Sequence, residues 1–390
     1  MPLRPALIIV GLLLAAACGG GSAAVPRSTP VIPTPTNAEA GGFPFDYSLA
    51  WETDFTKSSV PSSELLQRVA REGIPALEGA AVPFLATSEV DFLRDQEPVI
   101  SLEVGDDARA YPLQVLIWHE IVNDVVGGRP VAVTFCPLCN TAIVFDSVVD
   151  GRALSFGVSG FLRNSDLVMF DRETESWWQQ ATGEAIVGDF TGSQLKPLPA
   201  VIVSWSDFKE AFPKGRVLST ETGYRRTYGT NPYLGYDDVD STPFLYFGKS
   251  DGRLAAAERV VTVEIGDETV AYPFHLLEGQ PVVVDSVGGT EIVVFFKPGT
   301  VSALDQNSIA DSRDVGAATV FLPAADERRL TFRAVGDAFV DNETGSRWDI
   351  LGRAIDGALA GSKLEPVVSG NHFWFAWAAF KPETRIWQPD

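Results

Sequence analysis

Hydrophobic and polar residues alternate along several short stretches of this chain, and turn-forming residues separate the stretches. Residues 97–104 alternate and run into Gly105-Asp106-Asp107, which is typical of a strand followed by a hairpin turn. Residues 122–135 have the pattern of a second hairpin that turns at Gly127-Gly128. Three further stretches have the composition of strands, namely residues 141–146, 153–158 and 167–170. The pattern predicts short strands joined by tight turns.

Two helices are predicted among these strands. Pro112 suits the first turn of a short helix that extends to Trp118. Residues 204–212 begin with a serine that can cap a helix, and their apolar residues have helical spacing. The strands and helices do not alternate regularly, so the pattern does not support a doubly wound sheet. We predict a mainly β fold of the α+β class with a few short helices.

Part of the first half of the chain recurs in the second half. Residues 99–116 align with residues 260–277 without a gap, and residues 171–176 align with residues 341–346. Two copies are too few for a solenoid, which needs about three or more repeats. We therefore predict two homologous strand-rich units that pack as a pseudo-symmetric pair, residues 98–213 and residues 259–390.

The N-terminal stretch has the pattern of a targeting signal. Arg4 precedes an apolar run, residues 6–17, which is too short to span a membrane and is typical of a secretory signal. The small residues before Cys18 resemble a bacterial lipoprotein signal, in which this cysteine is lipidated; an ordinary signal peptide is the alternative. We predict a lipoprotein signal peptide in residues 1–17 and an extracytoplasmic protein, anchored through lipid on Cys18 to a membrane of the cell envelope.

The remaining segments link these parts. Residues 18–41 are rich in Gly, Ser, Ala, Pro and Thr, which predicts a flexible linker behind the lipid anchor. Residues 42–97 lead into the first unit. Residues 214–258 contain Tyr, Asn and Pro without periodicity, which indicates an ordered connector between the units. The connector either covers a site as a lid or joins the two units as a clasp.

The charge balance excludes one class of partner. The chain has 51 acidic and 30 basic residues, a formal net charge of -21, and no cluster of basic residues. Such a surface repels nucleic acid, so we expect no nucleic-acid partner. The sequence does not identify a protein partner or a small ligand.

The cysteines place the chemistry in the first unit. Beyond Cys18, the chain has only Cys136 and Cys139, in a Cys-Pro-Leu-Cys motif that directly follows the apolar residues 131–135. The second unit has Lys297-Pro-Gly-Thr300 at the matching position. The second unit is therefore cysteine-less, and its histidines, His275 and His372, have no partner cysteines.

Two thiols at this spacing support three chemistries. In the preferred hypothesis, Cys136, Cys139 and His119 bind a soft metal ion, copper or zinc. In the second, Cys136 and Cys139 are the catalytic pair of a thiol–disulfide redox protein. In the third, they form a structural disulfide in a non-enzymatic protein that binds a ligand or an envelope partner. Whether the protein is an enzyme stays open.

Polar and aromatic residues complete the candidate site. His119 is the only histidine of the first unit and is either a site residue or an ordinary core or surface residue. The run Arg163-Asn164-Ser165-Asp166 either lines a pocket or forms a hydrogen-bonded turn. One ring of Trp177-Trp178 either walls the pocket or packs in the core. The predicted pocket comprises Trp118, Glu120, Asn140, Arg163, Asn164, Ser165, Asp166 and Trp178.

Several motifs, in the same order along the chain, resemble the prokaryotic family known as domain of unknown function 3179. They are Tyr111-Pro112, Trp118-His119-Glu120, the run from Cys136 to Ala142, the run from Arg163 to Leu167, Ser302 to Asp305, and Gly370 to Phe375. The resemblance covers roughly residues 73–388. The family has no established activity, so the resemblance implies a shared constellation without a reaction: His119, Cys136, Cys139, Arg163, Asn164, Ser165 and Asp166.

Overall fold

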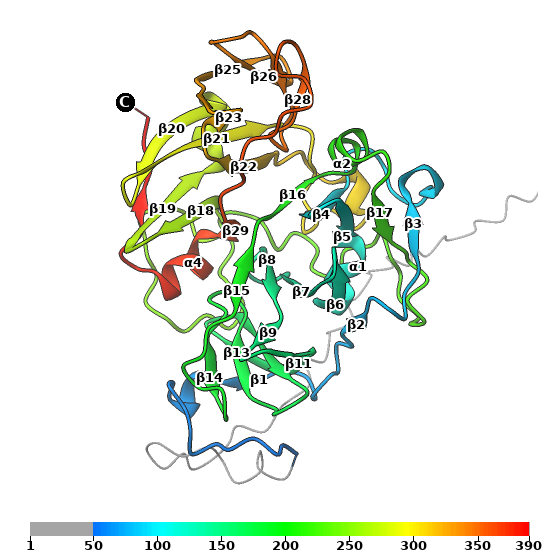
Figure 1. Ribbon diagram of the computed structural model, residues 1–390. Helices are drawn as coiled ribbons and strands as arrows, with labels where there is room; N and C mark the ends of the chain where they lie inside the picture. Colours follow the sequence, from blue (N-terminus) through cyan, green and yellow to red (C-terminus); the bar gives the residue numbers. More distant parts are fainter. Residues whose placement is uncertain (1–49, 390) are drawn as a thin grey trace, which may run out of the picture. The chain divides into compact units, whose positions relative to one another are not determined.

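The computed structural model describes residues 50–389; the predicted signal peptide, Cys18 and the linker of residues 18–41 lie outside the described residues. The described chain is mainly β with a few short helices, as predicted (Figure 1). The helices are α1 (Leu113–His119), α2 (Trp205–Ala211), α3 (Phe274–Gly279) and α4 (Trp374–Phe380), with 3-10 turns η2 (Ser62–Glu64), η3 (Thr87–Glu89) and η4 (Ile309–Asp311). Among these residues, no helix has the length and apolar character needed to cross a membrane.

The largest sheet contains the two cysteines and draws strands from both halves of the chain. Its nine strands are β2 (Leu77–Glu78), β6 (Ile121–Val126), β7 (Arg129–Cys136), β8 (Thr141–Asp146), β29 (Ser369–Phe373), β18 (Arg259–Ile265), β19 (Glu268–Pro273) and β30 (Arg385–Ile386) in that order, with β15 (Lys196–Leu198) also paired to β8. The two halves meet where Asn371 of β29 pairs with Ala142 of β8 (Figure 1).

Two five-stranded sheets belong to the first half of the chain. One has the order β16 (Ala200–Ser204), β4 (Pro98–Val104), β5 (Asp107–Pro112), β17 (Arg216–Leu218) and β3 (Phe84–Ala86). The other has the order β1 (Leu66–Gln67), β11 (Phe156–Arg163), β12 (Asp166–Asp171), β13 (Trp177–Gln179) and β14 (Ala185–Val187). The small ladder of β9 (Val148–Val149) and β10 (Arg152–Ala153) precedes β11.

The second half of the chain forms further small sheets. One contains β20 (Val282–Val287), β21 (Thr290–Lys297) and β22 (Ala317–Phe321), and another contains β25 (Phe332–Val335), β26 (Ala338–Asp341), β27 (Arg347–Trp348) and β28 (Ala354–Asp356). A two-stranded ladder joins β23 (Ala324–Ala325) to β24 (Arg328–Arg329). The largest hydrophobic core of the described chain includes both Cys136 and Cys139, and Leu304, Phe373 and Phe375 of the second half belong to it as well.

Most strand predictions are confirmed, because the alternating pattern and the turn residues are local signals. The hairpin at Gly127-Gly128 joins β6 to β7, and residues 141–146 form β8. The predicted strand of residues 153–158 is wrong at its start, since the ladder of β9 and β10 ends at Ala153 and β11 begins at Phe156. The helix after Pro112 is α1, which ends when Glu120 adopts a left-handed φ of 59°.

The strand pairing around β4 recurs around β18. β4 pairs with β5 and β16, and β18 pairs with β19 and β29. In addition, Tyr111 donates to Asp124 at 2.6 Å, and Tyr272 donates to Asp285 at 2.8 Å. The aligned tyrosines thus make matching contacts, each to an aspartate 13 residues further along the chain.

Candidate functional site

The two cysteines lie in a tight turn, residues 136–139, which we call the dithiol turn. Cys136 ends β7, Thr141 begins β8, and the two residues pair in register. Within the turn, the Cys139 amide donates to the Cys136 carbonyl at 3.2 Å, and Asn140 closes it with a left-handed φ of 48°. Both thiols are free and buried. The turn therefore holds two free thiols inside a core to which both halves of the chain contribute.

The tip of the hairpin between β11 and β12 contacts both thiols. Arg163 pairs with Asp166, and the two residues between them, Asn164 and Ser165, have φ values of 51° and 68°. This two-residue turn is strained without glycine, and such strain is often found at functional sites. The Ser165 carbonyl accepts from the Cys139 thiol at 3.4 Å and from the Cys136 thiol at 3.9 Å. The run from Arg163 to Asp166 is thus a turn that also lines the site.

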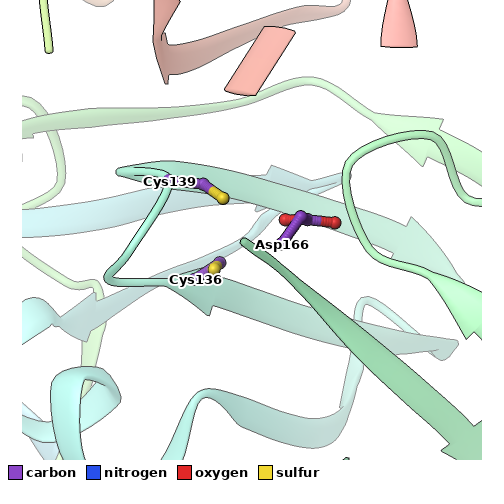
Figure 2. A group of neighbouring side chains, drawn as sticks. All are labelled: Cys136, Cys139 and Asp166. Atoms are coloured by element: carbon purple, nitrogen blue, oxygen red, sulfur yellow. The ribbon is translucent and has the colours of Figure 1, made fainter. Parts of the chain in front are cut away.

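Asp166 joins the thiols to form the Cys–Cys–Asp group of Cys136, Cys139 and Asp166. One ligand atom from each residue lies within 4.8 Å of the others, and Figure 2 shows the sulfurs and the carboxylate directed toward one another. The Asp166 Oδ2 accepts from Gln179 Nε2 at 2.5 Å and from the Ala181 amide at 2.9 Å. Its Oδ1 is buried and accepts no hydrogen bond from the described residues. One carboxylate oxygen is therefore available as a ligand.

Burial controls the protonation of this group. Burial raises the pKa of the Cys136 thiol, raises that of the Cys139 thiol still further, and raises the pKa of Asp166 to about 6. The neighbouring Asp166 raises both thiol pKa values in addition. Both thiols are therefore protonated at neutral pH. Disulfide exchange requires a thiolate, so this environment disfavours it, whereas a bound cation would favour deprotonation of the thiols.

Glu120 places a second carboxyl group near the dithiol turn. Its amide caps α1 by donating to the Leu116 carbonyl at 2.7 Å, and its own carbonyl accepts from Phe135 in β7 at 2.8 Å. Burial, and then the charge of Asp166, raises the pKa of Glu120 to about 8. The carboxyl is therefore mostly neutral at pH 7, although it lies in the same acidic environment as the thiols.

His119 lies outside the Cys–Cys–Asp group. Its Nδ1 lies 2.7 Å from the Pro75 carbonyl and its Nε2 lies 2.7 Å from the Tyr228 hydroxyl, so both ring nitrogens have hydrogen-bond partners. Burial lowers the pKa of His119 to about 4, which keeps the ring neutral. The structure thus brings Asp166, rather than His119, to the two thiols.

The other predicted pocket residues divide between the site and the core. Asn140 closes the dithiol turn, while Arg163 extends away from it and donates to Glu64 at 2.7 Å. Trp178 is fully buried, and its Nε1 donates to Asp171 at 2.9 Å, so this ring packs in the core. The ring of Trp118 is half-buried and packs against the core that contains both cysteines.

The connector, residues 214–258, packs over the dithiol turn. Tyr233 and Tyr236 lie against the core that contains both cysteines. Burial raises the pKa of Tyr236, and the thiols of Cys139 and Cys136 raise it further. The next residue, Asp237, anchors the connector, because its carboxylate accepts from Arg259 at 2.8 Å. The connector therefore covers the dithiol turn and is also bound, through Asp237, to Arg259 of β18.

The second half also contacts the dithiol turn. The Phe373 amide donates to the Cys139 carbonyl at 2.8 Å, and His372 Nδ1 lies 2.9 Å from the Thr141 hydroxyl. His372 thus contacts the first residue of β8, two positions after Cys139, although the second unit has no cysteine. The resemblance of Gly370 to Phe375 to a family motif was the only signal for this contact.

The packing of the connector over the dithiol turn predicts that loosening the connector changes the reactivity of the two thiols. Replacing Tyr236 with alanine removes a ring packed beside Cys139, so the site should open more often. We expect alkylation of Cys136 and Cys139 by iodoacetamide to accelerate about tenfold, since buried thiols react through local opening. Tyr246→Ala is the control, because this ring packs on the same core but contacts Phe375. Equal alkylation rates in wild type and Tyr236→Ala would argue against a cover.

Comparison with known proteins adds a family but no activity. A family model described as a protein of unknown function, DUF3179, matches residues 71–384. No curated protein matches the chain, and no solved structure matches it.

Proposed function

The chain belongs to the DUF3179 family of unknown function, and from its Cys–Cys–Asp group we propose that it binds a zinc ion. The observation that carries this proposal is the convergence of two buried thiols on a carboxylate whose Oδ1 has no hydrogen-bond partner among the described residues. An unpaired buried carboxylate oxygen is costly, and a bound cation would remove that cost.

The ligand types favour zinc over copper. Zn(II) accepts Cys sulfur and Asp oxygen in a tetrahedral arrangement, whereas Cu(I) prefers soft sulfur ligands. Three protein ligands would leave a fourth position, which in zinc sites of this kind is taken by water or substrate. Zinc would displace the thiol protons of Cys136 and Cys139, and because the pKa values of these thiols are raised, the affinity for zinc should increase with pH.

We propose that the two units arose by duplication and pack as a pseudo-symmetric pair, which the recurring pairing of β4 and β18 supports. The thiols occur in the first unit alone, and the second unit supplies Phe373 and His372 around them. The sequence around Cys18 supports an extracytoplasmic lipoprotein tethered to a membrane of the cell envelope.

Elemental analysis together with thiol counting tests the zinc proposal. The protein is purified under reducing conditions without added metal, and its metals and reactive thiols are measured before and after chelation. We expect about one zinc per chain and two thiols that become reactive only after chelation, because zinc-bound thiolates are protected. Absence of metal together with two free thiols, or with a disulfide, would overturn the proposal.

A further inference from the structure

A cavity of about 450 Å³ lies on the side of His119 that faces the connector. Its volume falls within the range of roughly 300–1,000 Å³ found for small-molecule sites. No member of the Cys–Cys–Asp group lines it. Six of its lining residues matter here: Arg94, Glu97, Gln114, Tyr224, Arg226 and Tyr228. We call it the arginine cavity.

The two arginines of this cavity lack ion-pair partners. Arg94 and Arg226 are both exposed, and neither forms an ion pair with another described residue. Most arginines of the described chain do form such pairs, for example Arg253 with Asp251 and Arg259 with Asp237. In a chain of net charge -21, two unpaired guanidinium groups on one cavity favour an anionic occupant.

The single acidic residue of the cavity does not oppose an anion. Glu97 is 3% exposed, and its Oε2 accepts from the Arg94 amide at 2.7 Å. Its Oε1 accepts from Gln114 Nε2 at 3.3 Å. Burial raises the pKa of Glu97, while the hydrogen bond from the Arg94 amide and the charge of Arg94 act to lower it. Both oxygens of this carboxyl are therefore engaged within the cavity wall.

Two tyrosines provide aromatic rings in the cavity wall, against which an organic molecule can pack. Tyr224 is 45% exposed and its ring packs against the His119 ring with centroids 5.3 Å apart, while the Tyr228 hydroxyl lies 2.7 Å from His119 Nε2. Aromatic walls with a few placed polar groups are typical of sites for organic molecules. We propose that the arginine cavity binds a small organic carboxylate, with its charge between Arg94 and Arg226 and its carbon body against Tyr224. This site is separate from the proposed zinc site and does not depend on it.

Titration calorimetry with defined anions tests this proposal on the purified protein. The probes are benzoate, succinate and inorganic phosphate, each at constant ionic strength. We expect saturable binding of benzoate or succinate, weakened about tenfold or more in Arg94→Ala and in Arg226→Ala, as for the loss of one charge-assisted hydrogen bond. Arg225→Ala is the matched control, because Arg225 is an exposed neighbour that does not line the cavity.

Each possible result of this titration either supports the carboxylate site or overturns it. Binding of a carboxylate that both arginine variants weaken and Arg225→Ala retains supports the site. Saturation by phosphate alone, carboxylate binding that Arg94→Ala and Arg226→Ala leave intact, or no saturable binding of any probe would overturn it. Since Arg94 and Arg226 are exposed, these variants should fold normally, which thermal unfolding of each variant checks.

Discussion

Replacing Cys136 with serine is expected to reduce the zinc content from about one ion per chain to nearly none. Cys136 and Cys139 are the only thiols in the described chain, and both belong to the Cys–Cys–Asp group. A hydroxyl is a far weaker zinc ligand than a thiolate, so a single sulfur and one carboxylate should not hold the ion. Metal analysis of protein purified under reducing conditions measures the effect.

Three further variants make this experiment specific. Asp166→Asn should also lose most of the zinc, because an amide replaces the carboxylate while Gln179 and Ala181 keep an oxygen to which they donate. His119→Ala should retain zinc, since the ring lies outside the group. Thr300→Val, at the position of the second unit that matches Cys139, is the control for a substitution in the corresponding turn that lacks thiols. Full zinc content in Cys136→Ser, with normal circular dichroism, would contradict the assignment.

Replacing Glu120 with glutamine is expected to stabilise the metal-free protein by several kcal/mol at pH 9 and by little at pH 5. The folded-state pKa of Glu120 is about 8, above its ordinary value of 4.5, because the carboxyl is buried beside Asp166. Between pH 4.5 and 8 the unfolded chain has released this proton while the folded chain still holds it. The free energy of unfolding therefore falls as the pH rises through this window, by up to about 1.4 kcal/mol per pH unit.

Urea unfolding of chelated protein at pH 5, 7 and 9 measures this dependence. The glutamine variant should have a flatter profile, because it lacks this contribution and retains the smaller ones of other buried carboxyls, such as Asp166 and Asp349, whose folded-state pKa values are each about 6. Glu210→Gln is the matched control, since Glu210 is an exposed residue of α2. Identical pH profiles for wild type and Glu120→Gln would show that Glu120 is not buried as a neutral acid.

The sequence by itself determined the local structure and the location of the thiols. Alternating residues and turn signals predicted β4 and β6 to β8, and Pro112 predicted α1, because these patterns depend on residues close together in the chain. The motif from Cys136 to Cys139 placed the site at the end of a buried strand, and the motifs in order predicted the family.

Only the tertiary structure decided which groups meet at the site. Asp166 reaches the thiols because the strained turn of the β11–β12 hairpin lies beside them, with Ser165, 26 residues beyond Cys139, in contact with the Cys139 thiol. His372 reaches Thr141 across 231 residues because β29 pairs with β8. The sequence favoured His119 as the third ligand by residue type, but its nitrogens bind Pro75 and Tyr228 instead. Local patterns fix which face of a strand is buried, whereas the neighbours of a buried side chain depend on how distant strands pack.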